Sequence, residues 1–359
     1  MQSLDIKLLT FHKANNYGAL LQCYALSKVL KDRGHNVELI NVNHHHNSGS
    51  FFKRLKNNLD LQKMENFRKL HLPAQTHEYV DVNDLSQNYP IADCYIVGSD
   101  QVWNPQITAN RAELYFFNFL PKNAIKIAYS ASFGIKEWEY KDLTESVTRY
   151  LQSFNAIGVR ESDGVNICKK TFGVDAIKTL DPTLLLNDYN ELIGTKTDKH
   201  KKTLVSYCFG KDEGFYTDLK LFSKKTGFKP VSLNDNKYHK GIKSIPFPSV
   251  KKWLLSLKTS SFVLTNSFHC MVFAILCKKP FVVLPANPTR ISRMLNLLDD
   301  LGLKDRFFES YAELHESNRW RNEIDYDEVF LKLEKLKKSS FDFLDASIDL
   351  SNLSKENRD

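Results

Sequence analysis

Patterns typical of membrane spans, secretion signals and cysteine-based sites are all missing from this sequence. The six cysteines among its 359 residues are scattered, and no two have the Cys-x-x-Cys spacing of zinc or redox sites. The most apolar stretch is interrupted by His269 and by Lys278-Lys279, so no run is long enough to cross a bilayer. The first residues carry charges within their apolar part, unlike a secretion signal. We therefore expect a cytoplasmic protein with reduced, buried thiols.

Motifs for nucleic acids and metals are missing as well. No basic-aromatic motif of an RNA or DNA module is present, so we expect no nucleic acid partner. His44, His45 and His46 are adjacent, and neighbours on an extended segment point to opposite sides, so we expect no shared metal ion. Neither a metal nor another cofactor is predicted. The formal net charge of +8 suits an anionic ligand or surface.

Length and hydrophobic patterning predict two α/β domains. A chain of 359 residues with 42% hydrophobic residues can form two cores. Strand-like and helix-like segments alternate in both halves, which favours parallel sheets and two Rossmann-like domains facing each other across a cleft. The predicted divisions are an N-terminal α/β domain at 1–186, a polar linker at 187–202, a C-terminal α/β domain at 203–325 and a C-terminal helix with a tail at 326–359.

In the N-terminal half, polar loops follow predicted strands. The strand Ile6–Thr10 precedes the turn at 13–18 and a helix at 19–30, and the strand at 94–97 leads into Gly98. After Gly98 come a carboxylate, two amides and an aromatic ring, typical of a corner that binds sugar or moves a proton; they are Asp100, Gln101, Asn104 and Trp103. The alternative is that Asp100 only caps the next turn.

Arg160 follows another predicted strand, at 156–159. A guanidinium there is suited to a bidentate grip on phosphate or carboxylate. We therefore predict Arg160 to bind an anionic donor.

The segment from Phe262 to Leu284 predicts a strand, a loop, a helix and a second strand. Ser267 is a suitable N-cap, which leaves the amides of Phe268 and His269 at a positive helix end where an anion can bind. His269 would then be a proton donor to the bound anion. The alternative is a buried structural histidine in an ordinary helix.

Residues 51–70 predict a basic amphipathic helix, with charges from Lys53 to Lys69. Such a helix can rest on an anionic membrane, and it can equally be an ordinary helix with a solvated basic face.

Taken together, ordered motifs resemble the polysaccharide pyruvyl transferase family from residue 16 to about 306. They are Asn16-Tyr-Gly-Ala-Leu-Leu-Gln-Cys-Tyr-Ala-Leu26, Val97-Gly-Ser-Asp-Gln-Val-Trp-Asn-Pro105, Tyr129-Ser-Ala-Ser-Phe-Gly134, Val159-Arg-Glu161, Leu180-Asp-Pro-Thr-Leu-Leu185, and Ser267-Phe-His269 followed by Phe273, Pro280 and Phe281. The resemblance implies a two-domain fold of the glycosyltransferase B type.

The resemblance also implies roles for individual residues. Asp100, Arg160 and His269 match positions that look functional in the family. For the chemistry we predict His269 and Asp100 as the catalytic pair, one as acid and one as base, in either order. Other branches have an arginine where this chain has Ser267, and Arg290 is the replacement candidate. The predicted donor contacts are Arg160, Ser267, Phe268, Arg290 and Arg293, and the predicted acceptor contacts are Asn16, Tyr17, Gln101, Trp103 and Asn104.

The activity implied is transfer of the pyruvyl group of phosphoenolpyruvate to a pair of sugar hydroxyls. The product is a pyruvate ketal on a capsular or exopolysaccharide building block, and phosphate is released. Expected partners are phosphoenolpyruvate and a sugar acceptor, including one linked to polyprenyl diphosphate at the inner face of the membrane. The alternatives are a nucleotide-sugar glycosyltransferase of the same fold and a non-catalytic glycan-binding or assembly protein.

Overall fold

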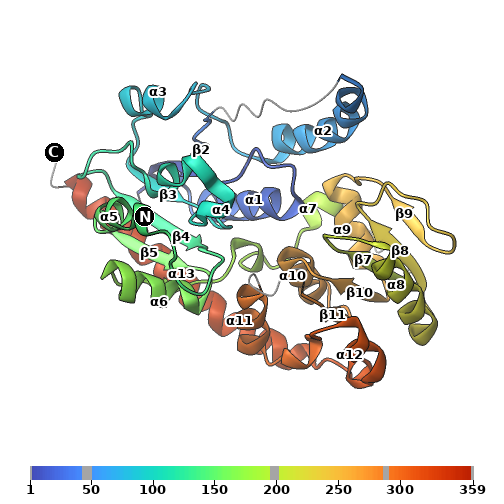
Figure 1. The fold of residues 1–359 in the computed structure, drawn as a ribbon. Coiled ribbons are helices and arrows are strands. Elements are labelled where there is room, and N and C mark those ends of the chain that lie inside the picture. The colour runs from blue at the N-terminus through green and yellow to red at the C-terminus, as the bar shows by residue number, and fades with distance from the viewer. Residues whose placement is uncertain (1, 43–50, 195–201, 286–290, 357–359) are drawn as a thin grey trace. The chain divides into compact units, whose positions relative to one another are not determined.

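The chain folds into two α/β units, each built on one parallel sheet (Figure 1). The structure is a computed structural model that describes residues 2–42, 51–194, 202–285 and 291–356. Unit 1 comprises Met1–Gly49, Arg68–Leu186 and Glu334–Asp359, and unit 2 comprises Ser50–Phe67 and Asn187–Leu333. Arg290 and the three histidines at 44–46 lie outside the described residues.

Unit 1 is organised on a six-stranded sheet with the strand order β2-β1-β3-β4-β5-β6. Every pair of neighbouring strands is parallel. The strands are β1 Asp5–Leu9, β2 Asn36–Leu39, β3 Cys94–Val97, β4 Lys126–Ala131, β5 Ala156–Val159 and β6 Ile177–Lys178. The helices wholly in this unit are α1 Tyr17–Asp32, α3 Val82–Gln87, α4 Pro105–Thr108, α5 Lys141–Leu151 and α6 Ser162–Phe172.

The strand order creates a switch point between β1 and β3. The chain passes from β1 to β2 on one side, and then returns to place β3 on the other side of β1. Ligands of open parallel sheets bind at the carboxyl ends of strands where the order reverses in this way. The loops after β1 and β3 therefore form the favoured binding edge of unit 1.

Unit 2 repeats the same plan with five parallel strands in the order β11-β10-β7-β8-β9. Its switch point lies between β7 and β10, so the favoured edge carries the loops after these two strands. The strands are β7 Thr203–Tyr207, β8 Lys229–Leu233, β9 Lys243–Ile245, β10 Phe262–Thr265 and β11 Phe281–Val283. The helices are α7 Asn190–Ile193, α8 Glu213–Thr226, α9 Val250–Thr259, α10 Phe268–Leu276, α11 Ser292–Leu301 and α12 Tyr311–Glu316.

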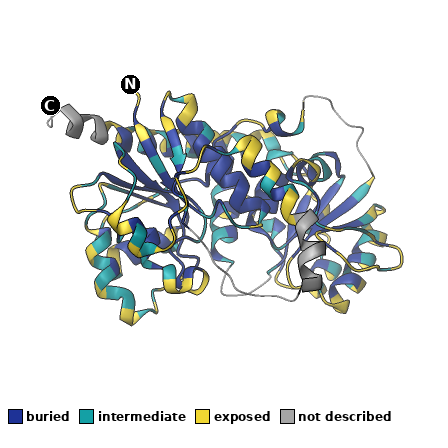
Figure 2. Cartoon of the chain, turned by 90° about the horizontal axis from the view of Figure 1, so that it is seen from above, coloured by how far each residue is buried: buried dark blue, intermediate teal, exposed yellow. Residues whose placement is uncertain are grey.

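Apolar side chains on the inner strands produce the two cores. All six residues of β4 and all four of β10 are buried, as expected for strands covered on both faces. Figure 2 shows that the exposed residues lie mainly on the outer faces of helices and on loops. Within the described residues, no helix combines the length and apolar character required to cross a membrane.

Two helices contribute to both units, which corrects the predicted continuous domains. Helix α2, Phe51–His71, changes unit after Phe67, and helix α13, Tyr326–Glu356, changes unit after Leu333. The later part of α13 packs on unit 1, where Asp345 Oδ1 accepts a hydrogen bond of 2.6 Å from Arg33 Nε. A Cβ atom on Gly158 of β5 would lie 2.7 Å from the Phe343 ring, so this glycine permits the close approach.

The predicted linker is also partly a packed element. Its first residue, Asn187, begins the second part of unit 2. However, α7 lies within the predicted linker, and the Tyr189 ring before it packs against Phe273 at a centroid distance of 4.9 Å. Residues 195–201 are not among the described residues.

Candidate functional site

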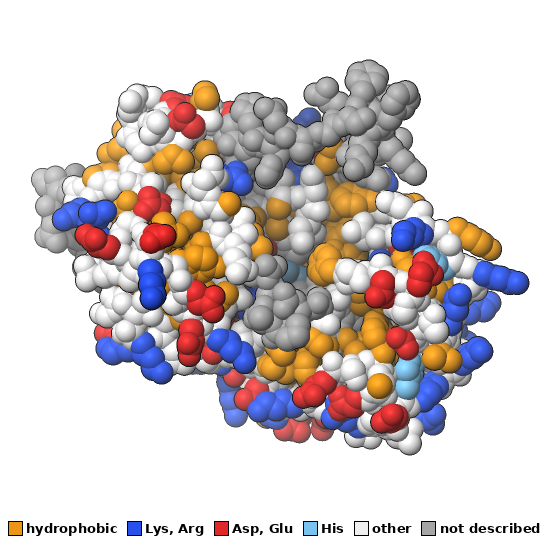
Figure 3. Space-filling model, viewed as in Figure 1, with side chains coloured by type: hydrophobic (Ala, Val, Ile, Leu, Met, Phe, Trp, Pro, Cys, Tyr) orange, Lys and Arg blue, Asp and Glu red, His pale blue; other side chains and the backbone are white. Residues whose placement is uncertain are grey.

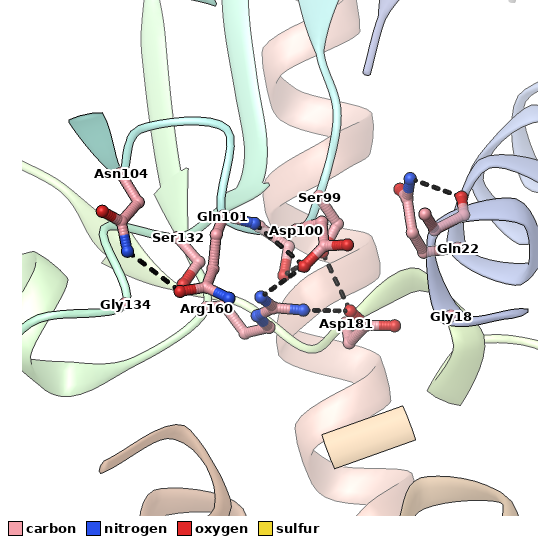
Figure 4. Close-up of polar contacts among 12 residues, drawn as sticks. Gly18, Gln22, Ser99, Asp100, Gln101, Asn104, Ser132, Gly134, Arg160 and Asp181 are labelled. Atoms are coloured by element: carbon pink, nitrogen blue, oxygen red, sulfur yellow. Dashed lines mark hydrogen bonds and ion pairs between the residues drawn. The ribbon is translucent and has the colours of Figure 1, made fainter. Parts of the chain in front are cut away.

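Asp100 lies at the favoured edge of unit 1, directly after β3. Its φ of 83° is rare for a residue with a side chain, and such strain often occurs at functional sites. The carboxylate Oδ1 accepts hydrogen bonds from Gln101 N at 2.9 Å and from Arg160 Nη2 at 3.3 Å (Figure 4). Asn104, rather than Asp100, caps α4. The bond from Gln101 N shows that the Asp100 carboxylate does serve the turn after β3, so the alternative that Asp100 only caps this turn stays in place beside the functional one.

Arg160 is enclosed by carboxylates. Its side chain is 2% exposed, and its guanidinium contacts Asp181 at 2.8 Å, Asp100 at 3.3 Å and Glu161 at 3.9 Å. Burial lowers the pKa of Arg160, but the three carboxylates raise it by more, so its pKa lies above the ordinary value. The geometry therefore favours a positioning role for Arg160 instead of the predicted contact with donor phosphate.

Asp181 is the fixed end of this ion pair, and the sequence analysis gave it no role. Its Oδ2 accepts hydrogen bonds from Arg160 Nη1 and from Ser99 Oγ, at 2.8 Å and 2.9 Å. Its Oδ1 accepts from the backbone and hydroxyl of Thr183. With four donors and a fully buried side chain, the Asp181 carboxylate holds Arg160 in one orientation. The motif at 180–185 could have suggested this residue.

Glu161 fixes the neighbouring loop after β4. One carboxylate oxygen accepts hydrogen bonds from Ser132 Oγ at 2.9 Å and from Gly134 N at 3.1 Å. Gly134 has a φ of +65°, and a Cβ atom on it would lie 2.2 Å from Gln101 Oε1. The glycine therefore allows the loops after β3 and β4 to meet.

The predicted acceptor residues near Asp100 differ in accessibility. Gln101 is half-buried, and its Oε1 accepts a hydrogen bond of 3.0 Å from Asn104 Nδ2. Asn104 is buried and caps α4. The Trp103 ring lies in the hydrophobic core, stacked on the Phe116 ring at a centroid distance of 5.1 Å, and its Nε1 donates a hydrogen bond to Tyr115 O. The Trp103 ring, which the sequence predicted as an acceptor contact, is therefore enclosed by the core.

The loop after β1 adjoins the loop after β3. Thr10 Oγ1 donates a hydrogen bond of 3.0 Å to Ser99 O and accepts one of 2.8 Å from Gln22 Nε2. Asn16 is the N-cap of α1, and Tyr17, the first residue of α1, is buried. Asn16 therefore shapes the start of α1, and both predicted acceptor residues lie at the favoured edge.

The start of α10 lies at the favoured edge of unit 2. Ser267 is its N-cap, with Oγ 3.5 Å from Cys270 N, as the sequence predicted. His269 is the second residue of the helix and is 7% exposed. The helix has nine residues, so its N-terminal amides and its dipole favour a bound anion here.

Two buried thiols lie near this edge. Burial raises the pKa of Cys208 to about 12, and it also raises the pKa of Cys270 well above the ordinary value. Because a thiolate is the reactive form, neither cysteine is suited to nucleophilic catalysis at neutral pH.

Arg293 brings positive charge to the same helix start. Its guanidinium carbon lies 5.7 Å from the centroid of the Phe268 ring, within the range of a cation–π contact. Arg293 comes from α11, so a second element supplies charge near Ser267 and His269. Arg290, the other predicted donor residue, is not among the described residues.

The predicted site residues thus form two groups. Asp100, Gln101, Asn104 and Arg160 gather in unit 1, and Ser267, Phe268, His269 and Arg293 gather in unit 2. A meeting of Asp100 with His269 across a cleft stays a prediction. In the part of the chain that the structure describes, no three His, Cys, Asp or Glu side chains are arranged to hold a metal ion.

Comparison with known proteins adds a family and a fold. A family model described as polysaccharide pyruvyl transferase matches residues 16–288. General stress protein 30 of Bacillus subtilis (strain 168) is 24% identical over 244 residues, which cover 61% of this chain and 67% of that protein.

Solved structures resemble the whole chain at low sequence identity. Arabidopsis thaliana UGT89C1 complexed with UDP-L-rhamnose has a TM-score of 0.56 at 10% identity, over 98% of this chain and 100% of that one. UDP-GlcNAc 2-epimerase from Neisseria meningitidis bound to UDP-GlcNAc has a TM-score of 0.56 at 12% identity, over 95% of this chain and 99% of that one. These likenesses show the fold, which is of the glycosyltransferase B type with two Rossmann-like domains.

Proposed function

Because the chain belongs to the polysaccharide pyruvyl transferase family, we propose that it transfers the pyruvyl group of phosphoenolpyruvate to a sugar. The product is a pyruvate ketal that bridges two hydroxyls of a surface polysaccharide building block, and phosphate is released. The family match over residues 16–288 carries this proposal, because that range includes the loop after β3 in unit 1 and the loops after β7 and β10 in unit 2.

The proposed donor site is the start of α10. Phosphoenolpyruvate is strongly anionic, and the amides after Ser267 with the guanidinium of Arg293 supply hydrogen bonds and charge. Arg290 is proposed as a further contact. Arg160 is left out of this site because its guanidinium is already neutralised by three carboxylates.

The proposed acceptor site is the favoured edge of unit 1. Asp100 is the part-exposed carboxylate of its cluster, with 15% of its side chain exposed, whereas Asp181 and Glu161 are fully buried. Arg160 and the Gln101 amide fix the direction of the Asp100 carboxylate. Gln101 and Asn16 are the proposed polar contacts to the sugar.

The chemistry requires an acid, a base and charge stabilisation. The methylene carbon of phosphoenolpyruvate takes up a proton, which leaves an oxocarbenium-like centre at C2. One sugar hydroxyl adds to C2 and loses its proton. Phosphate then departs with the electron pair of its C–O bond, and the second hydroxyl adds to C2, loses its proton and closes the ketal.

We assign the proton transfers to two residues. His269 neutralises the departing phosphate or delivers the proton to carbon, and Asp100 accepts the proton of the sugar hydroxyl. The reverse assignment, in which Asp100 protonates carbon, uses the same two groups.

The proposed acceptor includes oligosaccharides linked to polyprenyl diphosphate. In Figure 3, basic and acidic side chains are interspersed over the face in view, so the net charge of +8 is not concentrated in one large patch there. The membrane contact that we propose is therefore a local one, made by the basic residues of α2.

The test is incubation with phosphoenolpyruvate and a panel of free and lipid-linked galactosides and mannosides. Mass spectrometry should detect the gain of one pyruvate ketal, together with release of inorganic phosphate. Parallel reactions with nucleotide sugars test the glycosyltransferase alternative, which predicts the gain of a sugar unit. Glycan binding without turnover of any donor would favour the non-catalytic alternative.

A further inference from the structure

Arg68 lies on α2 and contacts the loop between β1 and α1. Its side chain is buried, with 8% of the residue exposed. Nε donates to His12 O at 2.8 Å, and Nη2 faces Lys13 O at 2.8 Å, Ala14 O at 3.0 Å and Asn15 Oδ1 at 2.9 Å. One guanidinium therefore binds four consecutive residues of this loop.

The loop needs such a partner because its carbonyl groups lie outside the sheet. Backbone carbonyls that leave water must find a donor, and these three successive carbonyls lie beyond the end of β1. Guanidinium is planar and has five donors in a fixed arrangement, so it can serve several carbonyls at once. A lysine at the same position has a single nitrogen and cannot reproduce this pattern.

The position of the loop gives the contact a functional meaning. The loop follows β1 at the switch point of unit 1. At its start, Thr10 Oγ1 donates a hydrogen bond to the backbone oxygen of Ser99, the residue before Asp100. Its last residue, Asn16, caps α1 and is a proposed sugar contact. The shape of one wall of the acceptor site therefore depends on where Arg68 holds residues 12–15.

We propose that Arg68 is a positioning residue that fixes the loop at 12–15 as one wall of the acceptor site. The charge of Arg68 on α2 is therefore used inside the protein and not for contact with an anionic membrane. The role of the loop in acceptor binding rests on the proposed function, whereas the contact itself does not.

Three variants test the inference. Arg68→Met removes all donors and keeps an apolar stem, Arg68→Lys keeps the charge, and Lys69→Met changes the exposed neighbour on the same helix as a control. Hydrogen–deuterium exchange of a peptide covering residues 11–17 reports on the loop. Michaelis constants for acceptor and phosphoenolpyruvate report on the site.

In Arg68→Met we expect exchange in this peptide to be faster by about tenfold or more, because the loss of even one charged hydrogen bond has about that effect and this variant removes four. The Michaelis constant for the acceptor should rise by about the same factor, whereas that for phosphoenolpyruvate should stay within twofold. For Arg68→Lys, the exchange rate and the acceptor constant should fall between those of wild type and Arg68→Met. For Lys69→Met, both should match wild type.

Unchanged exchange at 11–17 would overturn the inference. Faster exchange with an unchanged acceptor constant would overturn the positioning role and leave a purely structural one. If Arg68→Met does not fold, Arg68→Lys is judged by the same two outcomes. The exchange measurement needs no substrate, so it separates failure of this inference from failure of the proposed function.

Discussion

Asn266 binds both backbone polar groups of Phe209, although the two residues lie 57 positions apart in the sequence. Its Oδ1 accepts from Phe209 N at 2.8 Å, and its Nδ2 donates to Phe209 O at 2.9 Å. Phe209 follows β7 and Asn266 follows β10, so this pair joins the two loops at the switch point of unit 2. Phe209 is 47% exposed there.

Asn266→Ala should therefore loosen the proposed donor site. It removes both hydrogen bonds next to the cap Ser267, so the dissociation constant for phosphoenolpyruvate should rise roughly tenfold, as for the loss of one to two hydrogen bonds. Isothermal calorimetry measures this constant. Asn322→Ala, at an exposed position of unit 2, is the control and should bind as wild type does. Equal affinity in Asn266→Ala and wild type would show that the pair does not support the donor site.

Arg160→Met should destabilise the protein. It leaves the Asp100, Asp181 and Glu161 carboxylates without their cation, and breaking a buried ion pair by removing one partner costs about 3–5 kcal/mol of unfolding free energy. Urea unfolding followed by circular dichroism measures the change.

Arg149→Met, at an exposed position of α5, is the control for Arg160→Met and should change stability little. A variant of Arg160 with wild-type stability and weaker phosphoenolpyruvate binding would contradict the positioning role. That result would support the donor contact predicted from the sequence.

Arg293→Ala should weaken binding of phosphoenolpyruvate by about 1.5–3 kcal/mol, the range for hydrogen bonds to charged groups. The same loss is expected for Arg290→Ala from the sequence alone. Arg321→Ala is a matched control, because Arg321 also lies over an aromatic ring of unit 2, at 4.8 Å from the Trp320 centroid. If Arg293→Ala binds phosphoenolpyruvate as tightly as Arg321→Ala does, Arg293 is not part of the donor site.

Helix α2 should contribute modestly to binding of anionic membranes. Lys63 donates to Phe247 O at 3.0 Å, and Arg68 binds the loop after β1, so these two charges are used internally. Each remaining basic residue near an anionic surface contributes about 1 kcal/mol at low salt. Replacing Lys53, Arg54 and Lys56 by Glu should therefore reduce co-sedimentation with phosphatidylserine vesicles at low salt.

The control variant for α2 replaces three exposed lysines outside this helix, at positions 141, 170 and 224, by Glu. This variant should keep the part of vesicle co-sedimentation that depends on α2. Wild-type sedimentation that responds neither to phosphatidylserine content nor to salt would rule out a membrane role for α2.

Local signals predicted much of the fold. The strands at 94–97 and 156–159 and the cap Ser267 were located correctly, because apolar runs and capping residues are short-range patterns. The strands β8 and β9 were not predicted from the sequence. Pro230 lies within β8, which masks the strand pattern, and β9 is a three-residue edge strand.

Contacts between distant residues explain the remaining differences. The sequence suggested that Arg160 binds an anionic ligand. Its actual partners include Asp100 and Asp181, and because these lie 60 and 21 positions away, the local sequence around Arg160 does not reveal them. The sequence predicted Trp103 as an acceptor contact because only the folded core reveals Phe116 stacked on its ring. The division of α2 and α13 between two units also depends on tertiary packing, which helical periodicity does not report.

His269 provides the most direct test of the central claim, which is transfer from phosphoenolpyruvate at the start of α10. Wild type, His269→Gln and His269→Ala are incubated with phosphoenolpyruvate labelled with carbon-13 in the pyruvyl group and with the sugar acceptor. His315→Gln is the control, because the His315 ring is hydrogen-bonded to Asp218 at 3.0 Å in the same unit. We predict labelled ketal and one phosphate per transfer in wild type and His315→Gln, and a loss of about a hundredfold or more in both folded His269 variants. Unlabelled acceptor in the wild-type reaction, or near-normal transfer by folded His269→Gln, would contradict the claim.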